Sequence, residues 1–307
     1  MNNLADKFFE SIKGKKVGFI GIGTSNLPLI KLFSDKGAVV SAYDKKDFES
    51  LGENAVKAKE YGAELVLGED YLSKLDGNII FRSPGTPFYR PELVALREKG
   101  VVLTSEMEVF FDLCPCKIIA ITGSDGKTTT TTIISEFLKA SGVNVHLGGN
   151  IGRPLLPEIR DVKPEDVAVV ELSSFQLISM RRSPDTALIT NVAPNHLDMH
   201  KSMEEYISAK ENIFTHQTVR DIAESCGVSE SYVHRAVRQI ESLTVKEYIN
   251  QLRLRHAIHQ MERGGNSLSV ISKTCGFQSV SYFYRVFKKY YGMTPTQYFS
   301  EKNFIPE

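Results

Sequence analysis

The segment Lys117-Ile-Ile-Ala-Ile-Thr-Gly-Ser-Asp-Gly-Lys-Thr-Thr129 decides the fold of the front part of the chain, residues 1–217. Its apolar start predicts a buried parallel strand, and its end predicts a loop that opens a helix. Backbone N–H groups at such a helix start hold phosphate oxygens, Lys127 adds positive charge, and the Thr128 hydroxyl can join a Mg²⁺ shell. We therefore expect phosphate binding by Gly123, Gly126, Lys127, Thr128 and Thr129.

A second glycine loop lies earlier in the chain. Lys16–Ile20 predicts a strand, Gly21-Ile-Gly-Thr-Ser-Asn26 a turn, and Leu27–Lys36 a helix before a second strand that ends at Asp44. This is the dinucleotide-type arrangement, in which glycines admit a diphosphate and the acid accepts from a ribose or base. Asn26 stands where a third glycine is usual, so a bare structural turn remains an alternative. A further strand runs into the rigid turn 82–87.

Three segments downstream of the phosphate loop carry polar groups at the ends of predicted strands or loops. They are Gly148-Gly-Asn-Ile-Gly-Arg-Pro154, Val167-Ala-Val-Val-Glu-Leu-Ser-Ser-Phe-Gln176 and Leu188-Ile-Thr-Asn-Val-Ala-Pro-Asn-His-Leu-Asp198. In a parallel sheet such ends converge on one edge. Glu171 or His196 taken alone could be a satisfied buried polar group, but together, after this loop, they predict a functional site.

These motifs resemble the Mur ligase family of peptidoglycan synthesis, in particular its D-glutamate-adding members, over about residues 10–214. The resemblance implies ATP and Mg²⁺ as cofactors, with Glu171 as a magnesium ligand, His196 near a second magnesium and Lys210 as a carbamylated lysine. It also implies binding of UDP-N-acetylmuramoyl-L-alanine, with Asn150 and Ser173 at the muramoyl-alanine end. Its UDP-sugar site would use Gly21, Gly23, Thr24, Ser25, Asn26, Asp44, Ser83 and Gly85.

In the family, a substrate carboxylate attacks the γ-phosphate of ATP, and an amine then displaces the resulting acyl phosphate. The family pattern continues past the lysine, completing the central sheet and adding a third domain that binds D-glutamate. The present pattern instead changes near Gln217. We therefore expect an exposed strand edge and an uncovered apolar face. Full ligation by this chain alone is not expected.

The rear part, residues 218–307, carries two helix-turn-helix patterns. The first spans 218–233, with Gly227 at its turn and Ser229 as a helix cap, and the second spans 267–283. A predicted helix from about Val245 to Arg263 joins them. The pattern resembles the DNA-binding domain of AraC-type regulators over about 218–300. Departures are Val237 for an aromatic residue, Ser242 for glycine and Ser272 for alanine.

The AraC resemblance implies that each recognition helix lies in the major groove of double-stranded DNA. The candidates for base or phosphate contacts are Ser231, His234, Arg235 and Arg238 in the first helix and Ser279, Ser281, Tyr284 and Arg285 in the second, with Lys288 and Lys289 on phosphates. The alternative for any single one is a solvated helix face.

In AraC-type domains a helix normally precedes the first unit, and here that helix would fall where the sequence pattern changes, near Gln217. Met203–Phe214, inherited from the ligase pattern, could replace it, because Ile207, Ile213 and Phe214 could supply an apolar face. The same segment would also have to present Lys210 to the ligase site. The sequence leaves this possibility open.

Composition agrees with two unlike parts. The front part holds 25 Lys/Arg against 29 Asp/Glu, and the rear part 12 against 8. This balance fits an enzyme-like front and a nucleic-acid-facing rear. The four cysteines predict no disulfide framework, and Cys114-Pro-Cys116 is interpreted as structural or incidental. With no signal pattern and no apolar run near the roughly 20 residues that span a bilayer, we predict a cytoplasmic protein without a membrane partner.

We predict an α/β fold with a Rossmann-like N-terminal domain (1–113) and a partial P-loop α/β central domain (114–217), followed by an all-α double helix-turn-helix domain (218–307). Three interpretations remain. The chain is a truncated ligase fused to a DNA-binding domain, a regulator whose front senses a nucleotide or UDP-muramoyl ligand, or two unrelated coding sequences joined together. The abrupt join favours the third, because natural fusions usually meet at exposed linkers.

Overall fold

The computed structural model describes residues 3–193, 202–214, 219–220, 229–263 and 267–302. Two compact units make up the chain. Unit 1 comprises Met1–Ile118 and Thr128–Gln176, and unit 2 comprises Ile119–Lys127 and Leu177–Glu307. No described helix has the length and apolar character needed to cross a membrane.

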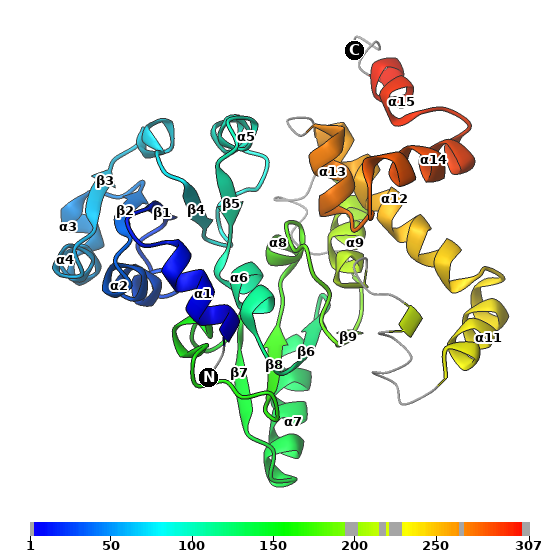
Figure 1. Ribbon diagram of the computed structural model, residues 1–307, viewed down its shortest axis with the longest axis horizontal. Helices are drawn as coiled ribbons and strands as arrows, with labels where there is room; N and C mark the ends of the chain where they lie inside the picture. Colours follow the sequence, from blue (N-terminus) through cyan, green and yellow to red (C-terminus); the bar gives the residue numbers. More distant parts are fainter. Residues whose placement is uncertain (1–2, 194–201, 215–218, 221–228, 264–266, 303–307) are drawn as a thin grey trace. The chain divides into compact units, whose positions relative to one another are not determined.

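The first sheet has five parallel strands in the order β3-β2-β1-β4-β5 (Figure 1). Its strands are β1 Lys16–Ile20, β2 Val39–Asp44, β3 Glu64–Leu67, β4 Ile79–Arg82 and β5 Val102–Thr104. The first strand lies between β2 and β4, with Ile20 opposite both Tyr43 and Arg82. The loops that follow β1 and β4 therefore lie side by side at the switch point of the sheet, where α/β folds bind ligands.

The helices of this region are α1 Asn3–Ser11, α2 Leu27–Asp35, α3 Phe48–Leu51, α4 Glu53–Glu60, η1 Tyr71–Lys74, α5 Pro91–Glu98 and α6 Glu106–Leu113. Aromatic packing joins α2 to the sheet. The Phe19 and Phe81 rings stack with centroids 4.9 Å apart, and Phe33 from α2 meets Phe81 edge-on at 4.9 Å. All three side chains are fully buried, so this contact fixes α2, and hence the glycine loop before it, against β1 and β4.

The second sheet contains β6 Lys117–Thr122, β7 Val145–Gly149, β8 Val167–Glu171 and β9 Thr186–Ile189, in the order β7-β8-β6-β9. Strands β7 and β8 pair in parallel, as do β6 and β9. Its helices are α7 Lys127–Ala140, η2 Leu156–Glu158 and α8 Ser174–Leu177. The predicted α/β fold with parallel sheets is confirmed.

The expected strand edge is also present, because β9 ends the described sheet and Leu188 within it is 38% exposed. Apolar surface is exposed on α7 as well, where the Phe137 side chain is 71% accessible. Isolated exposed apolar residues are common on proteins, but a phenylalanine this open is unusual on a helix that borders a sheet.

The rear helices are α11 Glu230–Glu241, α12 Val245–Arg263, α13 Leu268–Thr274, α14 Val280–Tyr291 and α15 Pro295–Lys302. Serine side chains cap three of them: Ser229, Ser267 and Ser279 each accept a hydrogen bond from the backbone N–H three residues on. The predicted joining helix is α12. Much of the first helix-turn-helix unit, including Gly227, lies outside the described residues.

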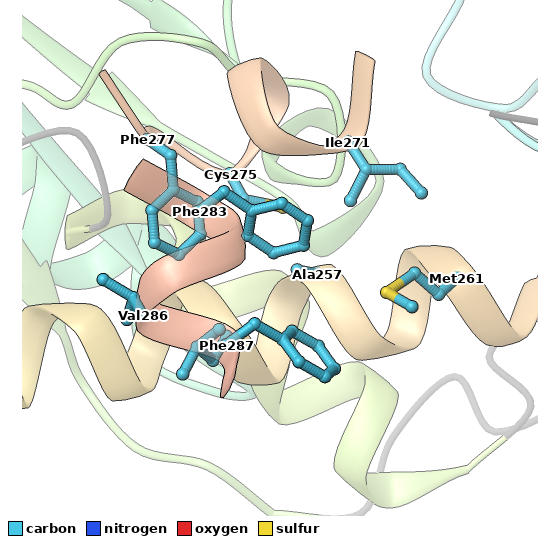
Figure 2. Close-up of a cluster of buried hydrophobic side chains, with 9 residues drawn as sticks. Ala257, Met261, Ile271, Cys275, Phe277, Phe283, Val286 and Phe287 are labelled. Atoms are coloured by element: carbon cyan, nitrogen blue, oxygen red, sulfur yellow. The ribbon is translucent and has the colours of Figure 1, made fainter. Parts of the chain in front are cut away.

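The second helix-turn-helix unit encloses a hydrophobic cluster, and Figure 2 shows its side chains gathered between α12, α13 and α14. Phe283 and Phe287 of α14 are fully buried in it, with ring centroids 5.7 Å apart. The remaining members are Leu254, Ala257, Met261, Ile271, Cys275, Phe277 and Val286. An all-α domain with this core confirms the fold predicted for the rear part.

The segment that the sequence left open forms helix α9 (Met203–Glu211) and the short turn η3 (Asn212–Phe214), and both contact α12. Ser208 Oγ lies 3.4 Å from His256 Nδ1, and Arg255 pairs with Glu211 at 3.1 Å. The Ile213 side chain is 1% exposed. Helix α9 and η3 therefore pack against α12. Their replacement of the helix that normally precedes the first unit stays a hypothesis, because residues 221–228 of that unit lie outside the described residues. The conflict over Lys210 disappears because Tyr206 and Lys210, one helical turn apart, use another face of α9.

Candidate functional site

The glycine loop after β1 borders a cavity of about 320 Å³. Lining residues predicted from the sequence are Gly21, Gly23, Thr24, Ser25, Asn26, Asp44 and Ser83. Asn26 is buried, and its Nδ2 donates to the carbonyls of Ile20 at 2.8 Å and Gly21 at 3.0 Å. The residue that replaces the third glycine therefore braces the loop from inside.

Asp44, the acid at the end of β2, also shapes this loop. Its Oδ2 accepts from the Ile22 N–H at 2.8 Å, and its Oδ1 accepts from the Lys46 N–H at 3.0 Å. Both carboxylate oxygens thus hold backbone in place while the side chain still borders the cavity. The loop is preformed, which reduces the ordering cost of binding a ligand.

A second cavity, of about 140 Å³, shares Thr24, Ser25 and Asn26 with the first and reaches Asn150. Ser173 and Gly85, which the resemblance placed with the substrate, are not among the lining residues of either cavity. Ser173 instead donates its N–H and Oγ–H to Gln176 Oε1 at 2.9 and 3.0 Å. Gln176 and Arg153, which were not singled out from the sequence, line this cavity.

Glu106, at the start of α6, also lines the second cavity and was missed by the sequence reasoning. One carboxylate oxygen accepts from the N–H groups of Leu155 and Leu156, both at 2.8 Å. Burial raises the pKa of Glu106 to about 7 despite these two bonds, which act in the opposite direction. The cavity therefore contains a carboxyl group that titrates near neutral pH.

The phosphate loop has the backbone shape that its glycines predict. Gly123 and Gly126 have φ values of 154° and 74°, and a Cβ atom at Gly123 would collide with Thr190 Oγ1. Helix α7 begins at Lys127, whose Nζ donates to the carbonyls of Gly123 at 3.0 Å and Ser124 at 2.9 Å. The lysine is thus folded over its own loop, which is the position from which it can reach a phosphate.

Asn191, just after β9, holds the same loop from the other side. Its Oδ1 accepts from the N–H of Ser124 at 3.1 Å and from that of Asp125 at 2.9 Å. The sequence reasoning quoted this residue within a motif but assigned it no role. Its place as a polar group at a strand end was the signal that could have identified it.

Glu171, at the end of β8, brings together two of the predicted side chains. Thr128 Oγ1 donates to Glu171 Oε2 at 2.7 Å, and Asn150 Nδ2 donates to Oε1 at 2.8 Å. The carboxylate is 1% exposed. A threonine hydroxyl and a carboxylate are oxygen ligands of the kind that Mg²⁺ prefers, and magnesium usually keeps several waters besides, so the pair fits the ion. His196 lies outside the described residues.

Lys210 reaches the phosphate loop from α9. Its Nζ donates to the Gly123 carbonyl at 2.6 Å and lies 4.5 Å above the Tyr206 ring. The Tyr206 hydroxyl is 3.0 Å from Ser124 Oγ. Burial, and then the ammonium of Lys127, lower the pKa of Lys210 to about 8. A sizeable fraction of the amine is therefore neutral near physiological pH, as carbamylation requires.

On α11 the predicted DNA-facing residues are exposed and share one surface. Ser231, His234, Arg235 and Arg238 line a shallow hollow of about 480 Å³ together with Gln239. The Arg235 guanidinium lies 5.6 Å above the Tyr232 ring. This stacking holds a cation at the helix surface without burying its charge.

On α14 the predicted residues divide into two groups. Ser281, Arg285 and Lys288 are exposed, and Arg285 lies 5.2 Å above the Tyr282 ring. The other three have partners within the fold. Ser279 caps the helix, the Tyr284 hydroxyl is 2.9 Å from Thr296 Oγ1, and exposed Lys289 pairs with Glu247 at 3.2 Å.

Comparison with known proteins supports both parts. A Mur ligase middle domain model matches residues 121–278, and a model of bacterial regulatory helix-turn-helix proteins of the AraC family matches 261–300. The UDP-N-acetylmuramoylalanine--D-glutamate ligase of Clostridium kluyveri is 48% identical over 250 residues, covering 80% of this chain and 55% of that protein. The ligase of the same name from Clostridium botulinum strain Hall is 51% identical over 223 residues, covering 72% and 49%.

The chain thus spans about half the length of the curated relatives it matches. Among solved structures, a DNA-binding transcriptional dual regulator from Escherichia coli K-12 is 33% identical, covering 28% of this chain and 81% of that one, with a TM-score of 0.25. The matches confirm both resemblances drawn from the sequence. The chain belongs to the Mur ligase family, and its Mur-ligase-like region is fused to an AraC-type helix-turn-helix region.

Proposed function

We propose that the front part binds ATP with Mg²⁺ and UDP-N-acetylmuramoyl-L-alanine, and that the rear part binds double-stranded DNA. The observation that carries the first half is the bonding of Thr128 and Asn150 to the buried Glu171 carboxylate at the start of α7. Thr128 and Glu171 would supply oxygen ligands to a cation, and Thr128 directly follows the loop that would bind the phosphates.

Within the ATP site each residue has a defined task. Lys127 exchanges its bonds to the loop carbonyls for bonds to phosphate oxygens, because an ammonium group binds an anion more strongly than a neutral carbonyl. Thr128 and Glu171 would hold Mg²⁺, which supplies positive charge to the phosphates when bound. Lys210, at the Gly123 carbonyl, is placed to serve as the carbamylated lysine once its neutral amine has reacted with carbon dioxide.

The UDP-muramoyl ligand would occupy the two cavities that meet at Thr24, Ser25 and Asn26. In dinucleotide sites a glycine loop of this kind binds the diphosphate, and Gly23, Thr24 and Ser25 of the loop line the first cavity. Asn150 lines the second cavity and also bonds Glu171, so it connects the nucleotide-sugar cavity with the magnesium ligands.

Calorimetric titration of the full chain with ATP and Mg²⁺ tests the ATP site. Lys127→Ala should weaken ATP binding by about tenfold or more, the effect of removing a charge-assisted phosphate contact. Lys139→Ala is the matched control, because Lys139 lies on the same helix but pairs with Glu136 near its other end. Equal ATP affinities in the two variants would overturn the proposal. D-glutamate-dependent ADP release, measured in parallel, tests for ligation.

A second candidate function, a regulator that senses its nucleotide, is favoured by one observation. Helix α9 places Lys210 on the phosphate loop and Glu211 on Arg255 of α12, so one helix contacts both functional regions. If nucleotide binding moves α9, the affinity for DNA must change with it. Equal DNA affinities with and without saturating ATP and Mg²⁺ would exclude this function.

A further inference from the structure

Cys114 and Cys116 form a close pair of thiols that the proposed function does not use. Cys114 ends α6, where its N–H donates to the Phe110 carbonyl, and Cys116 directly precedes β6. The two Sγ atoms are 3.4 Å apart. Pro115 between them has a fixed φ, which limits how far the two cysteines can separate. The sequence alone favoured an incidental pair, but the sulfur positions support a chemical role.

The two thiols differ in exposure and in acidity. Cys116 is 7% exposed, whereas Cys114 is half-buried and nearer to solvent. The hydrogen bond from Cys114, and after it the Ala168 N–H, lower the pKa of Cys116, while burial and Asp166 oppose them. Reactive cysteines combine thiolate character with accessibility. In this pair the 3.4 Å contact lets the two sulfurs exchange one proton, so the thiolate stabilised at Cys116 can also form at the more exposed Cys114.

Cys275 shows the opposite case within the same chain. It is fully buried in the cluster of Figure 2, and burial raises its pKa well above the usual value. Such a thiol is protonated at neutral pH and shielded from reagents, so it serves as an internal reference.

We infer that Cys114 and Cys116 are a redox modification site that reacts with low-molecular-weight disulfides and closes to an intramolecular disulfide. In the first step one proton of the thiol pair is lost to solvent, and the other passes along the sulfur–sulfur hydrogen bond from Cys114 to Cys116. The Cys114 thiolate formed in this way is the more exposed of the two sulfurs, and it attacks the reagent disulfide. A mixed disulfide forms at Cys114, and the first reagent thiolate leaves.

In the second step Cys116 loses its proton to solvent and attacks Cys114 Sγ. The Cys114–Cys116 bond forms, and the second reagent thiolate leaves and is protonated. The two protein sulfurs are oxidised and the two reagent sulfurs are reduced, so the exchange balances without another reactant. The sulfurs need only move from 3.4 Å to a bond length of about 2.0 Å.

Oxidised glutathione and the full-length protein provide the test. Trypsin releases residues 100–117 as one peptide that contains both cysteines and no others. A closed disulfide lowers the mass of this peptide by two hydrogens. We expect closure to be at least about tenfold faster than modification of Cys275, and dithiothreitol should restore the original mass. Cys116→Ser should instead accumulate the glutathione adduct at Cys114, because the second step is blocked. Cys114→Ser should not close.

Cys275→Ala is the matched control, since its peptide 100–117 should close as in the unmodified chain. Circular dichroism establishes that each variant is folded. The inference is overturned if the unmodified chain stops at the glutathione adduct, or if it and Cys116→Ser accumulate equal amounts of that adduct. It is also overturned if all the disulfides that form join two chains.

Discussion

The second helices of the two helix-turn-helix units, α11 and α14, share exposed residues but differ at two matched positions that face inward. Each helix is capped by a serine, Ser229 for α11 and Ser279 for α14. Each also carries an arginine over a tyrosine ring, and the pairs are Arg235 with Tyr232 and Arg285 with Tyr282. The turn after each helix also repeats, because Thr244 bonds Glu247 just as Thr294 bonds Gln297. The caps and the exposed cations are therefore common to both units.

Beneath this surface the units differ. Where α14 buries Phe283 and Phe287, α11 has Val233, which is buried, and Val237, which is only partly buried. Matched positions therefore carry phenylalanine in the second unit and the smaller valine in the described part of the first. Between α11 and α14 the exposed arginine is kept, whereas the inward-facing residues change in size. We therefore expect the two units to differ in stability more than in charge.

The largest effect is expected from the core of the second unit. Phe283→Ala should lower the free energy of unfolding by about 3–5 kcal/mol, because it removes a fully buried ring and leaves a cavity. Val233→Ala should lower it by only about 1–2 kcal/mol, since two methyl groups are lost. Urea unfolding followed by circular dichroism measures both. If the two variants lost equal free energy of unfolding, Val233 would contribute as much to stability as Phe283.

Helix α9 supports α12, which joins the two units. Ile213→Asp should lower the free energy of unfolding by about 2–4 kcal/mol, because a carboxylate would replace an apolar side chain that is 1% exposed. Leu188→Asp, at a half-exposed position of β9, is the control and should have a much smaller effect. An unchanged unfolding transition for Ile213→Asp would show that α9 does not stabilise the rear helices.

The shared arginines allow the two units to be compared in DNA binding. Arg285→Ala and Arg235→Ala should each weaken binding to mixed-sequence double-stranded DNA by about 1 kcal/mol and reduce the salt dependence by about one phosphate contact. Fluorescence anisotropy at several salt concentrations measures both quantities. Similar losses of DNA affinity in the two variants would support two equivalent DNA-binding surfaces. A loss of affinity in only one variant would mean that a single unit contacts DNA.

The smallest effect is expected at the helix ends. Ser242 and Gly292 end α11 and α14 with φ values of 57° and 74°, and Ser242 is the one described residue other than glycine with a positive φ. Ser242→Gly should therefore stabilise the chain by about 0.5–1 kcal/mol, and Gly292→Ser should destabilise it similarly. Thermal melting checks the pair. If Ser242→Gly lowers the melting temperature, the positive φ of Ser242 does not strain the backbone.

The sequence predicted those features that depend on neighbouring residues. The loop 122–129, the cap at Ser229 and the glycine-type position at Ser242 each follow from local backbone requirements, and the structure has them. Local reasoning also placed Glu171 at a strand end, where Thr128 bonds it. In each case the residue type is determined by backbone geometry that the sequence itself specifies.

The features that the sequence missed depend on packing between distant segments. Asn191 binds the backbone of a loop some 67 residues earlier. Ser173 donates to Gln176, which lines the second cavity, and the substrate role of Ser173 stays a prediction. Whether α9 would contact α12 could not be decided from an apolar pattern alone, because such a pattern does not name its partner.

Helix α9 also changes where the boundary of the fusion lies. The sequence pattern changes near Gln217, yet the segment Ile119–Lys127, which contains most of the phosphate loop, and the rear helices belong to one compact unit. A gene divided at that seam would remove α9 from α12 and expose Ile213 in one product while leaving α12 bare in the other. Because α9 contacts both the phosphate loop and α12, a substitution in it must remain compatible with two different neighbours.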